Sequence, residues 1–302
     1  MELRQLEYFQ MVSRLSSVTQ AANYLRVAQP SVTVAIRKLE EELGVILFDR
    51  SQKHFSLTAE GRAFARHVDG IMDRVGDSVR EMDDYRLLKK GKIKIGIPPM
   101  VGAFIFPYIF AEFQKAYPWL ELSVTEKGSL AIRGHLERGE LDVGIVTMMD
   151  YSPKLETAFI AAAQMLVCLP PAHPMEGLTC VPFRELRDES FILLKEDTYN
   201  RRVIIEECQR HQFTPRIVFS SSQIETILGL VGQGVGISFL LDAVVRRHPG
   251  IVSRPLAEPL RSEISLAWNR ERYLPKAARA FVDFIASCLP PGDKADEKNL
   301  RS

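Results

Sequence analysis

The chain has 302 residues, of which 46% are hydrophobic and 25% are charged, and its formal net charge is +1. These values are typical of globular proteins, and the length favours two or more domains. A net charge near zero excludes a basic character spread over the whole protein, so any nucleic-acid site must be a local patch.

The composition also bounds the compartment and the chemistry. The N-terminus lacks the basic-then-apolar pattern of a secretory signal, and no apolar run approaches the roughly 20 residues of a membrane span. The four cysteines are widely spaced without a C-x-x-C pair, and the six histidines form no H-E-x-x-H pattern. We therefore expect a reduced, cytoplasmic protein without a membrane segment, zinc module, disulfide, metal or cofactor.

Residues 1–58 contain short helical segments separated by helix-capping and turn residues. Ser17 with Gln20 three residues later matches a capping box, so a second helix should begin there. Pro30 fits the first turn of a third helix, and Gly44 is a suitable C-cap. Two helices joined by about four residues are a helix-turn-helix candidate. The apolar side of the preceding first helix consists of Leu3, Leu6, Phe9 and Val12.

The third helix, within "AQPSVTVAIRKLEEELG" (28–44), has two different sides. At 100° per residue, its core side consists of Val32, Ile36, Leu39 and Leu43. On the opposite side, Arg37 and Lys38 can neutralise phosphates, and Thr33 can bond a base edge or a phosphate. The acidic residues 40–42 would be repelled by DNA, so only the N-terminal half can enter a groove. Taken alone, this pattern also fits an ordinary solvated helix face.

The segment "LFDRSQKHFSLTAEG" predicts a two-stranded wing, because Phe48, Phe55 and Leu57 alternate with polar residues. Cations at its tip could contact phosphates or a minor groove, although a solvated hairpin tip is the alternative for each one alone. The predicted DNA-binding residues are Ser17, Thr19, Gln20, Gln29, Pro30, Ser31, Thr33, Val34, Arg37, Lys38, Arg50, Ser51, Lys53 and His54.

A long helix is predicted from Thr58 to about Tyr85, with apolar residues spaced 4, 3, 4, 3, 4 and 3 apart and interrupted only by Ser78. Such a stripe must be buried, either on the chain's own domain or, as we favour, on a second copy. A symmetric dimer would present two recognition helices to a dyad-related DNA site. The predicted dimer seam consists of Phe64, Val68, Ile71, Val75 and Met82.

These features together resemble the LysR-type transcriptional regulators along almost the whole chain. The resemblance rests on the block from "LEYFQMVSRLSSVTQAANYL" to "SLTAEG", and continues through "GKIKIGI", "FPYIFAEFQKAYPWLEL", "LERGELDVGIV" and "ILGLVGQGVGISFL". It implies an α/β multi-domain protein with a winged helix-turn-helix (1–58), a linker and dimerisation helix (59–90), and a two-lobed effector domain (91–302) like type 2 periplasmic binding proteins. Lobe I is expected at about 91–162 and 268–290, and lobe II at about 163–267.

The resemblance further implies a homotetramer built as a dimer of dimers, a small-molecule effector, and regulation through RNA polymerase. The chain departs from the family at Ala28, where Ser or Thr usually provides the N-cap. It also has Val34 and Ala35 where many members carry a polar pair. Val34 could touch a thymine methyl or lie over the sugar-phosphate edge, and the sequence does not separate these alternatives.

From residue 92 onward, strand-like and helical runs alternate, as in α/β folds. Ligands of such open sheets bind at the carboxyl ends of strands and at helix N-termini. Arg201 or Arg202 permits an anionic effector, although an exposed helix start explains them equally well. The predicted effector-binding residues are Pro99, Met100, Val101, Gly128, Ser129, Thr147, Met148, Thr198, Tyr199, Arg201, Arg202 and Phe239.

Two apparent motifs do not support other functions. "GQGVG" (232–236) follows a helical run and precedes a strand, the reverse of a dinucleotide-binding loop, so its glycines fit a tight turn. Cys208, which could suggest a redox sensor, has no second cysteine near it in the sequence and fits a buried thiol. We predict a DNA-binding regulator and not an enzyme. The alternative is a solute-binding or enzymatic α/β protein whose N-terminal helices only mediate assembly.

Overall fold

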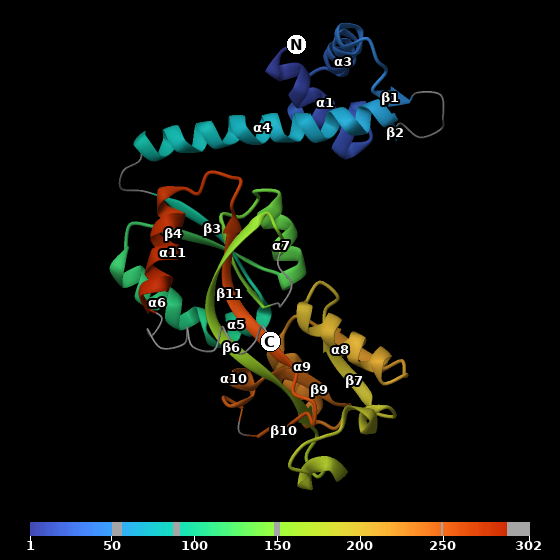
Figure 1. The fold of residues 1–302 in the computed structure, drawn as a ribbon, viewed down its shortest axis with the longest axis vertical. Helices are drawn as coiled ribbons and strands as arrows, with labels where there is room; N and C mark the ends of the chain where they lie inside the picture. Colours follow the sequence, from blue (N-terminus) through green and yellow to red (C-terminus); the bar gives the residue numbers. More distant parts are fainter. Residues whose placement is uncertain (50–55, 87–90, 148–151, 249, 289–302) are drawn as a thin grey trace. The chain divides into compact units, whose positions relative to one another are not determined.

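The computed structural model describes residues 1–49, 56–86, 91–147, 152–248 and 250–288. The chain forms two compact units, Met1–Asp83 and Asp84–Ser302 (Figure 1). No helix among the described residues is both long enough and apolar enough to cross a membrane.

The N-terminal unit confirms the predicted order of helices and wing strands. The Ser17 hydroxyl accepts a hydrogen bond from the Gln20 N–H (3.2 Å), Pro30 lies in the first turn of the third helix, and Gly44 ends that helix with φ +67°. Ala28 makes no side-chain cap, as expected from its missing hydroxyl. The elements are α1 (Leu3–Leu15), α2 (Val18–Leu25), α3 (Gln29–Leu43), β1 (Phe48–Asp49), β2 (Ser56–Leu57) and α4 (Ala59–Arg86).

One core holds these helices together. The Phe9 ring contacts Phe48 and Phe64 with centroids 5.2 and 5.1 Å apart, and α3 contributes three buried side chains, those of Val32, Ile36 and Leu39. Leu3 and Leu43, both predicted in this core, are instead exposed. They occupy the first turn of α1 and the last residue of α3, where no other described element of the unit covers them.

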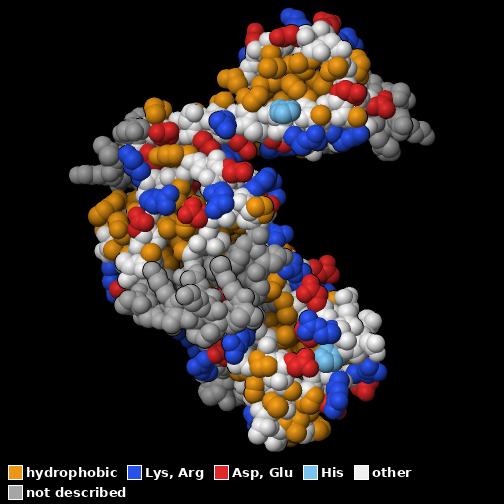
Figure 2. Space-filling model, in the orientation of Figure 1, with side chains coloured by type: hydrophobic (Ala, Val, Ile, Leu, Met, Phe, Trp, Pro, Cys, Tyr) orange, Lys and Arg blue, Asp and Glu red, His pale blue; other side chains and the backbone are white. Residues whose placement is uncertain are grey.

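The apolar stripe of α4 divides into two parts. Val68, predicted in the dimer seam, has no exposed surface and lies in the chain's own core. The reason is that the first turns of α4 close the helix-turn-helix on one side. Phe64 packs against the same core but is only half-buried, so its place in the seam stays a prediction. Further along, Ile71, Val79 and Met82 are exposed, and Val79 extends the stripe where the prediction had Ser78. Figure 2 shows hydrophobic side chains grouped on the surface of the N-terminal unit, with both charge signs interspersed elsewhere.

The second unit is built on a mixed sheet of seven strands in the order β10-β6-β11-β5-β3-β4, with β9 pairing to β6. Strands β3, β4 and β5 run parallel, whereas β11 is antiparallel to both β5 and β6. The strands are β3 (Lys92–Ile97), β4 (Glu121–Glu126), β5 (Val143–Thr147), β6 (Leu155–Leu169), β7 (Ser190–Leu194), β8 (Arg216–Ser221), β9 (Ser238–Leu241), β10 (Val252–Pro255) and β11 (Arg261–Asn269). The helices are α5 (Pro99–Phe104), α6 (Phe106–Ala116), α7 (Ser129–Glu137), α8 (Tyr199–Arg210), α9 (Ile224–Gly232), α10 (Asp242–Val245) and α11 (Lys276–Cys288), with 3-10 turns η1 (Pro174–Gly177) and η2 (Phe183–Leu186).

Strand β5 shows how the sheet is covered on both faces. Val143 and Ile145 point into the core that includes α11, whereas Val146 points into the core that includes α7. All five residues of the strand are buried, which is typical of a central parallel strand covered on both faces. Figure 1 shows α11 and α7 on opposite sides of this sheet.

Strand β6 connects the two lobes. Its residues 155–164 pair with β11, whereas residues 165–169 pair with β9 and β10. The change of partners falls close to the lobe boundary expected near residue 163. The second expected boundary, at 268, lies inside β11, whose residues 264–267 pair with β5 of lobe I. Strand pairing therefore places the whole of β11 with lobe I.

The segment "PPMVG" forms the first turns of α5 and not an open loop. Val101 is fully buried, Pro99 and Met100 are almost so, and the Met100 sulfur accepts a hydrogen bond from the Leu241 N–H (3.4 Å). Ile105 separates α5 from α6, and Pro107 lies in the first turn of α6. Pro99, Met100 and Val101 were predicted to bind the effector, but their side chains are instead buried in the core against lobe II.

Gly61 generates a stability prediction, because a Cβ there would lie 2.0 Å from the Leu47 carbonyl oxygen. We expect Gly61→Ala to destabilise the N-terminal unit by about 1–3 kcal/mol through overpacking. Gly70→Ala on the same helix meets no atom within 4 Å and should stabilise the unit by about 0.5–1 kcal/mol. Circular dichroism during urea unfolding of the full chain measures both. Equal midpoints for the two variants would contradict the prediction.

Candidate functional site

The recognition surface is the side of α3 that faces away from the N-terminal core. Val34 at its centre is 51% exposed, and Arg37 and Lys38 are exposed one turn further on. Thr33 is half-buried, and its hydroxyl bonds the Gln29 carbonyl oxygen one turn back (3.2 Å). The structure therefore gathers on one helix face all seven residues predicted from this segment: Gln29, Pro30, Ser31, Thr33, Val34, Arg37 and Lys38.

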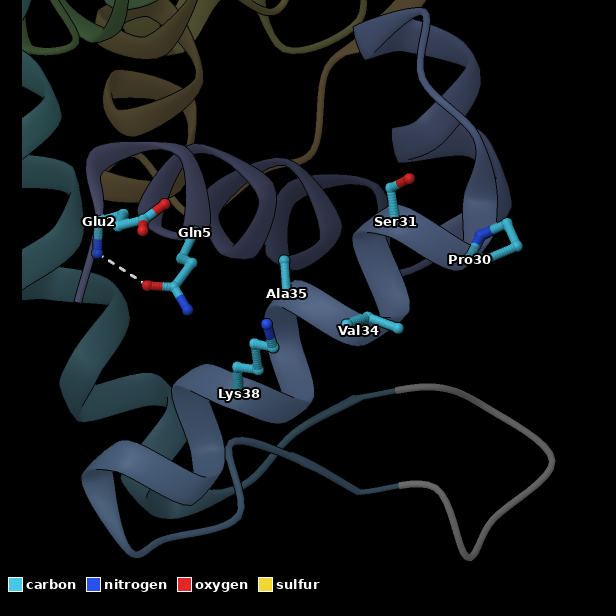
Figure 3. A pocket seen from close by; sticks show the side chains of 7 residues that line it. All are labelled: Glu2, Gln5, Pro30, Ser31, Val34, Ala35 and Lys38. Carbon is cyan, nitrogen blue, oxygen red and sulfur yellow. Dashed lines mark hydrogen bonds between the residues drawn. The ribbon is translucent and has the colours of Figure 1, made fainter.

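A hollow of about 470 Å³ lies between this face and the start of α1. Figure 3 shows Gln5 from α1 and Lys38 from α3 extending into it, with the Gln5 side-chain oxygen accepting a hydrogen bond from the Glu2 N–H (2.7 Å). Glu2 and Gln5 were not among the predicted DNA-binding residues. The prediction for the first helix used only the spacing of its apolar residues, so it assigned no role to the polar ones.

Helix α2 presents its predicted polar residues at one end. Thr19 and Gln20 are exposed, and Ser17 is half-buried as the N-cap. Tyr24 on the same helix is 70% exposed, which is unusual for a tyrosine, and the sequence analysis missed it. Its position in the last turn of α2 could have predicted this exposure, because the buried face of the helix consists of Ala21 and Ala22.

Glu40 differs from its predicted role as a solvated acid that DNA would repel. It is 6% exposed, and its carboxylate accepts hydrogen bonds from the backbone N–H groups of Leu47 (2.9 Å) and Phe48 (3.2 Å). These bonds tie the last turn of α3 to the start of β1. Glu41 and Glu42 are exposed, as expected.

The wing is described only at its base, where Phe48 pairs with Leu57 and Asp49 with Ser56. The predicted wing-tip contacts Arg50, Ser51, Lys53 and His54 lie outside the described residues, as does Met148 of the predicted effector site.

Of the predicted effector residues of lobe I, Gly128, Ser129 and Thr147 lie together at the carboxyl ends of β4 and β5. The Ser129 hydroxyl accepts a hydrogen bond from the Thr147 N–H (2.9 Å), which joins the start of α7 to the end of β5. The Gly128 N–H donates to the Asp197 carboxylate of lobe II (2.8 Å), and the Leu130 N–H donates to the Asp197 carbonyl oxygen (3.1 Å). The N-terminus of α7, a typical anion site, is thus bound by the chain's own carboxylate.

In lobe II, Thr198 is the N-cap of α8 and its hydroxyl accepts from the Arg201 N–H (3.3 Å). The Arg201 guanidinium donates to the Leu194 carbonyl oxygen (3.2 Å) and the Ser220 hydroxyl (2.7 Å). Arg202 lies over the Tyr199 ring, 4.9 Å from its centroid. Arg201 is therefore engaged by groups of its own lobe.

Two buried polar atoms near this region have no hydrogen-bond partner among the described residues, Thr147 Oγ1 and Asn200 Oδ1. Asn200 follows Tyr199 in the first turn of α8, and its amide nitrogen donates to the Phe239 carbonyl oxygen (3.4 Å). Asn200 was not among the predicted effector-binding residues. Phe239 was among them, but its ring is instead buried against Phe183 and Phe191. A buried asparagine within "EDTYNRR" has no sequence signal that distinguishes it from a surface residue.

Cys208 is fully buried on α8, and burial raises the pKa of its thiol to about 12. Burial likewise raises the pKa of the Cys168 thiol to about 12. Both thiols are therefore protonated at neutral pH and are poor nucleophiles. The prediction of a buried Cys208 is confirmed, whereas Cys180 is exposed.

Comparisons with known proteins agree with this division of the chain. Residues 3–62 match the family described as bacterial regulatory helix-turn-helix protein, lysR family, and residues 87–289 match the LysR substrate binding domain. A relative from Bacillus subtilis (strain 168), the uncharacterized HTH-type transcriptional regulator YwbI, is 32% identical over 292 residues, which cover 96% of this chain and 97% of the relative.

Solved structures show the same architecture. A full-length OxyR variant from Pseudomonas aeruginosa is similar with a TM-score of 0.62 and 27% identity, covering 95% of each chain. Full-length CbnR complexed with its target DNA is similar in fold, with a TM-score of 0.60 and 23% identity over 95% of this chain and 99% of that one.

The fold and the recognition surface define a DNA-binding transcriptional regulator with a substrate-binding effector domain. The chain belongs to the LysR family of bacterial regulators, as its resemblance had implied. The family places it among regulators and not among enzymes, which removes the alternative of a solute-binding or enzymatic protein with an assembly domain.

The burial of Cys168 and Cys208 predicts the order in which thiols react. At pH 8, iodoacetamide should modify Cys180 in the native protein and should modify Cys168 and Cys208 only after unfolding in denaturant. Peptide mass spectrometry after timed quenching measures each site. Modification of Cys208 as fast as Cys180 in the native protein would contradict its burial.

Proposed function

We propose that the protein is a sequence-specific regulator that binds a dyad-related operator through the recognition surface of α3. The observation that supports this most directly is that six of the seven predicted residues of α3 are exposed on the side away from the core, with Arg37 and Lys38 one turn from Val34, and the seventh, Thr33, is half-buried. Cations position the protein on phosphates, while small and polar side chains meet base edges in the major groove. Since the target is chromosomal DNA, we also propose that the protein works in the cytoplasm.

We further propose that the chain works as a homodimer through α4 and as a tetramer of two such dimers. The exposed apolar residues of α4, Ile71, Val79 and Met82, support a partner on this stripe, because an apolar side left in water is unfavourable. Val75 between them is half-buried. A symmetric dimer carries two α3 helices and so matches two half-sites of DNA.

We propose that a small-molecule effector binds where lobe I meets lobe II. Thr147 Oγ1 and Asn200 Oδ1 support this location, because buried polar atoms normally have partners. An anionic effector is less well supported than the sequence suggested, because the Asp197 carboxylate already accepts a hydrogen bond from the N–H of Gly128 at the start of α7. An effector that binds one arrangement of the lobes more tightly would shift the lobes toward it. This shift would change the placement of the dimers on DNA and their contacts with RNA polymerase.

The DNA proposal predicts the behaviour of Lys38→Ala. Loss of one phosphate contact per subunit should lower the slope of log affinity against log salt by about 1 for each lysine removed, with little change in sequence preference. Fluorescence anisotropy with DNA from upstream of the protein's own gene, at several salt concentrations, measures this.

The matched control is Lys115→Ala, which removes an exposed lysine of α6 in the second unit. It should leave both the affinity and the salt slope unchanged. If both variants bind like the wild type, Lys38 makes no phosphate contact. If the wild type binds no DNA at any salt concentration, the operator proposal itself is wrong.

The effector proposal predicts the behaviour of Thr147→Val. A metabolite screen by thermal shift on the full chain identifies a stabilising compound, and its affinity is then measured by calorimetry. The variant should bind it roughly five-fold more weakly, since one hydrogen bond contributes about 1 kcal/mol. The unliganded stability should change little, because the hydroxyl has no partner among the described residues. Thr226→Val on α9 serves as control, and equal affinities for all three proteins would exclude Thr147 from the site.

A further inference from the structure

A cluster of three potential metal ligands lies in lobe II, at the opposite end of α8 from Asn200 of the proposed effector site. Within the described residues, Glu207, His211 and Glu258 each place a ligand atom within 4.8 Å of the others. His211 Nε2 lies 3.9 Å from Glu207 Oε2 and 4.0 Å from Glu258 Oε2. The nitrogen is buried and has no hydrogen-bond partner among the described residues.

The distances exceed those of a hydrogen bond and leave room for an ion between the atoms. A tetrahedral zinc site with bonds of about 2.0–2.2 Å separates its ligand atoms by roughly 3.4 Å. His211 Nε2 and each of the two carboxylate oxygens must therefore approach by about half an ångström. Glu258 can supply that movement, because its side chain is 69% exposed in the turn between β10 and β11.

The other two ligands are held in place by their neighbours. Glu207 is buried, and Arg210 Nη1 bonds its other oxygen, Oε1 (2.7 Å), which leaves Oε2 facing the histidine. The His211 ring stacks on Phe183 with centroids 5.4 Å apart and planes 20° from parallel. Hydrogen-bonded carboxylates and oriented imidazoles are typical of the surroundings of metal sites.

The position in the fold also favours a cation. His211 is the C-cap of α8 and Glu207 lies in its last turn, where the helix dipole is negative. The opposing charges are Arg210, already paired with Glu207, and Arg187, whose Nη2 donates to the His211 carbonyl oxygen (3.3 Å). Two carboxylates and these two guanidinium groups sum to zero, so a divalent ion meets no net positive charge from the cluster.

We propose that Glu207, His211 and Glu258 form a site for a divalent transition-metal ion, zinc being the best match. Imidazole nitrogens and carboxylate oxygens are both ligands of zinc, and a water can take the fourth position of a site with three protein ligands. The ion would fasten the end of α8 to the turn after β10 and so stabilise lobe II. The sequence could not show this site, because Glu258 lies far along the chain from the i, i+4 pair on α8.

The test is calorimetry of zinc chloride with the full chain after removal of metals by a chelator. The wild type should bind one equivalent, with a thermal transition that rises with zinc concentration. His211→Ala should abolish this binding, and Glu258→Gln should weaken it at least ten-fold. Glu258 is exposed, so its variant remains informative if His211→Ala fails to fold.

The matched control is His248→Ala, because His248 Nε2 bonds Glu225 (2.9 Å) in a pair that has no third acidic ligand among the described residues. It should bind zinc like the wild type. Cobalt(II) adds a spectroscopic test, since a nitrogen and oxygen site gives visible d–d bands without the thiolate charge-transfer band of a cysteine site. Absence of a stoichiometric site, equal zinc affinity in the Glu258→Gln variant and the wild type, or a thiolate band would overturn the proposal.

Discussion

The recognition surface depends on the burial of one side of α3. Val32, Ile36 and Leu39 pack into the N-terminal core, and because successive residues of a helix turn by about 100°, their burial decides which side chains face outward. Val34 and Lys38 are exposed for this reason and not because of their own polarity. An apolar residue can therefore occupy the centre of a DNA-facing surface without being drawn into the core.

The buried carboxylate of Glu40 extends the same constraint to the wing. It accepts from the Leu47 and Phe48 N–H groups, so the end of α3 and the start of β1 share one set of hydrogen bonds. A buried charge is unfavourable unless it is hydrogen-bonded, and here two backbone donors satisfy it. The acidic end of α3 thus has two functions: Glu40 fixes the wing, while Glu41 and Glu42 remain in solvent.

The sequence predicted the elements better than the side-chain environments. The caps at Ser17 and Gly44 and the turn near Gly234 followed local rules, since each depends on a few neighbouring residues. Burial of Val68, Met100 and Phe239 depends on which distant elements meet, and periodicity within one segment cannot show this. For the same reason the sequence did not predict the contacts that Met100 and Phe239 make, and the location of the effector site stays a prediction. Asn200, buried but lacking any motif, is the clearest case.

The contact between Gly128 and Asp197 joins the start of α7 in lobe I to the segment before α8 in lobe II. Residue 128 must be glycine in this arrangement, because a Cβ there would lie 2.1 Å from the Asp197 carbonyl oxygen. The same two residues share a backbone-to-carboxylate hydrogen bond, and Tyr199 nearby packs with Ile132 and Leu136 of α7.

A carboxylate at the N-terminus of α7 is favoured by the helix dipole, so an anionic ligand at that position would have to exchange with Asp197. Such an exchange would remove a bond between the lobes, and binding would then be coupled to their separation. A neutral ligand bonded to Thr147 and Asn200 would leave the bond in place and would strengthen the contact between the lobes. At the proposed effector site, the charge of the ligand would therefore decide the direction in which it shifts the lobes.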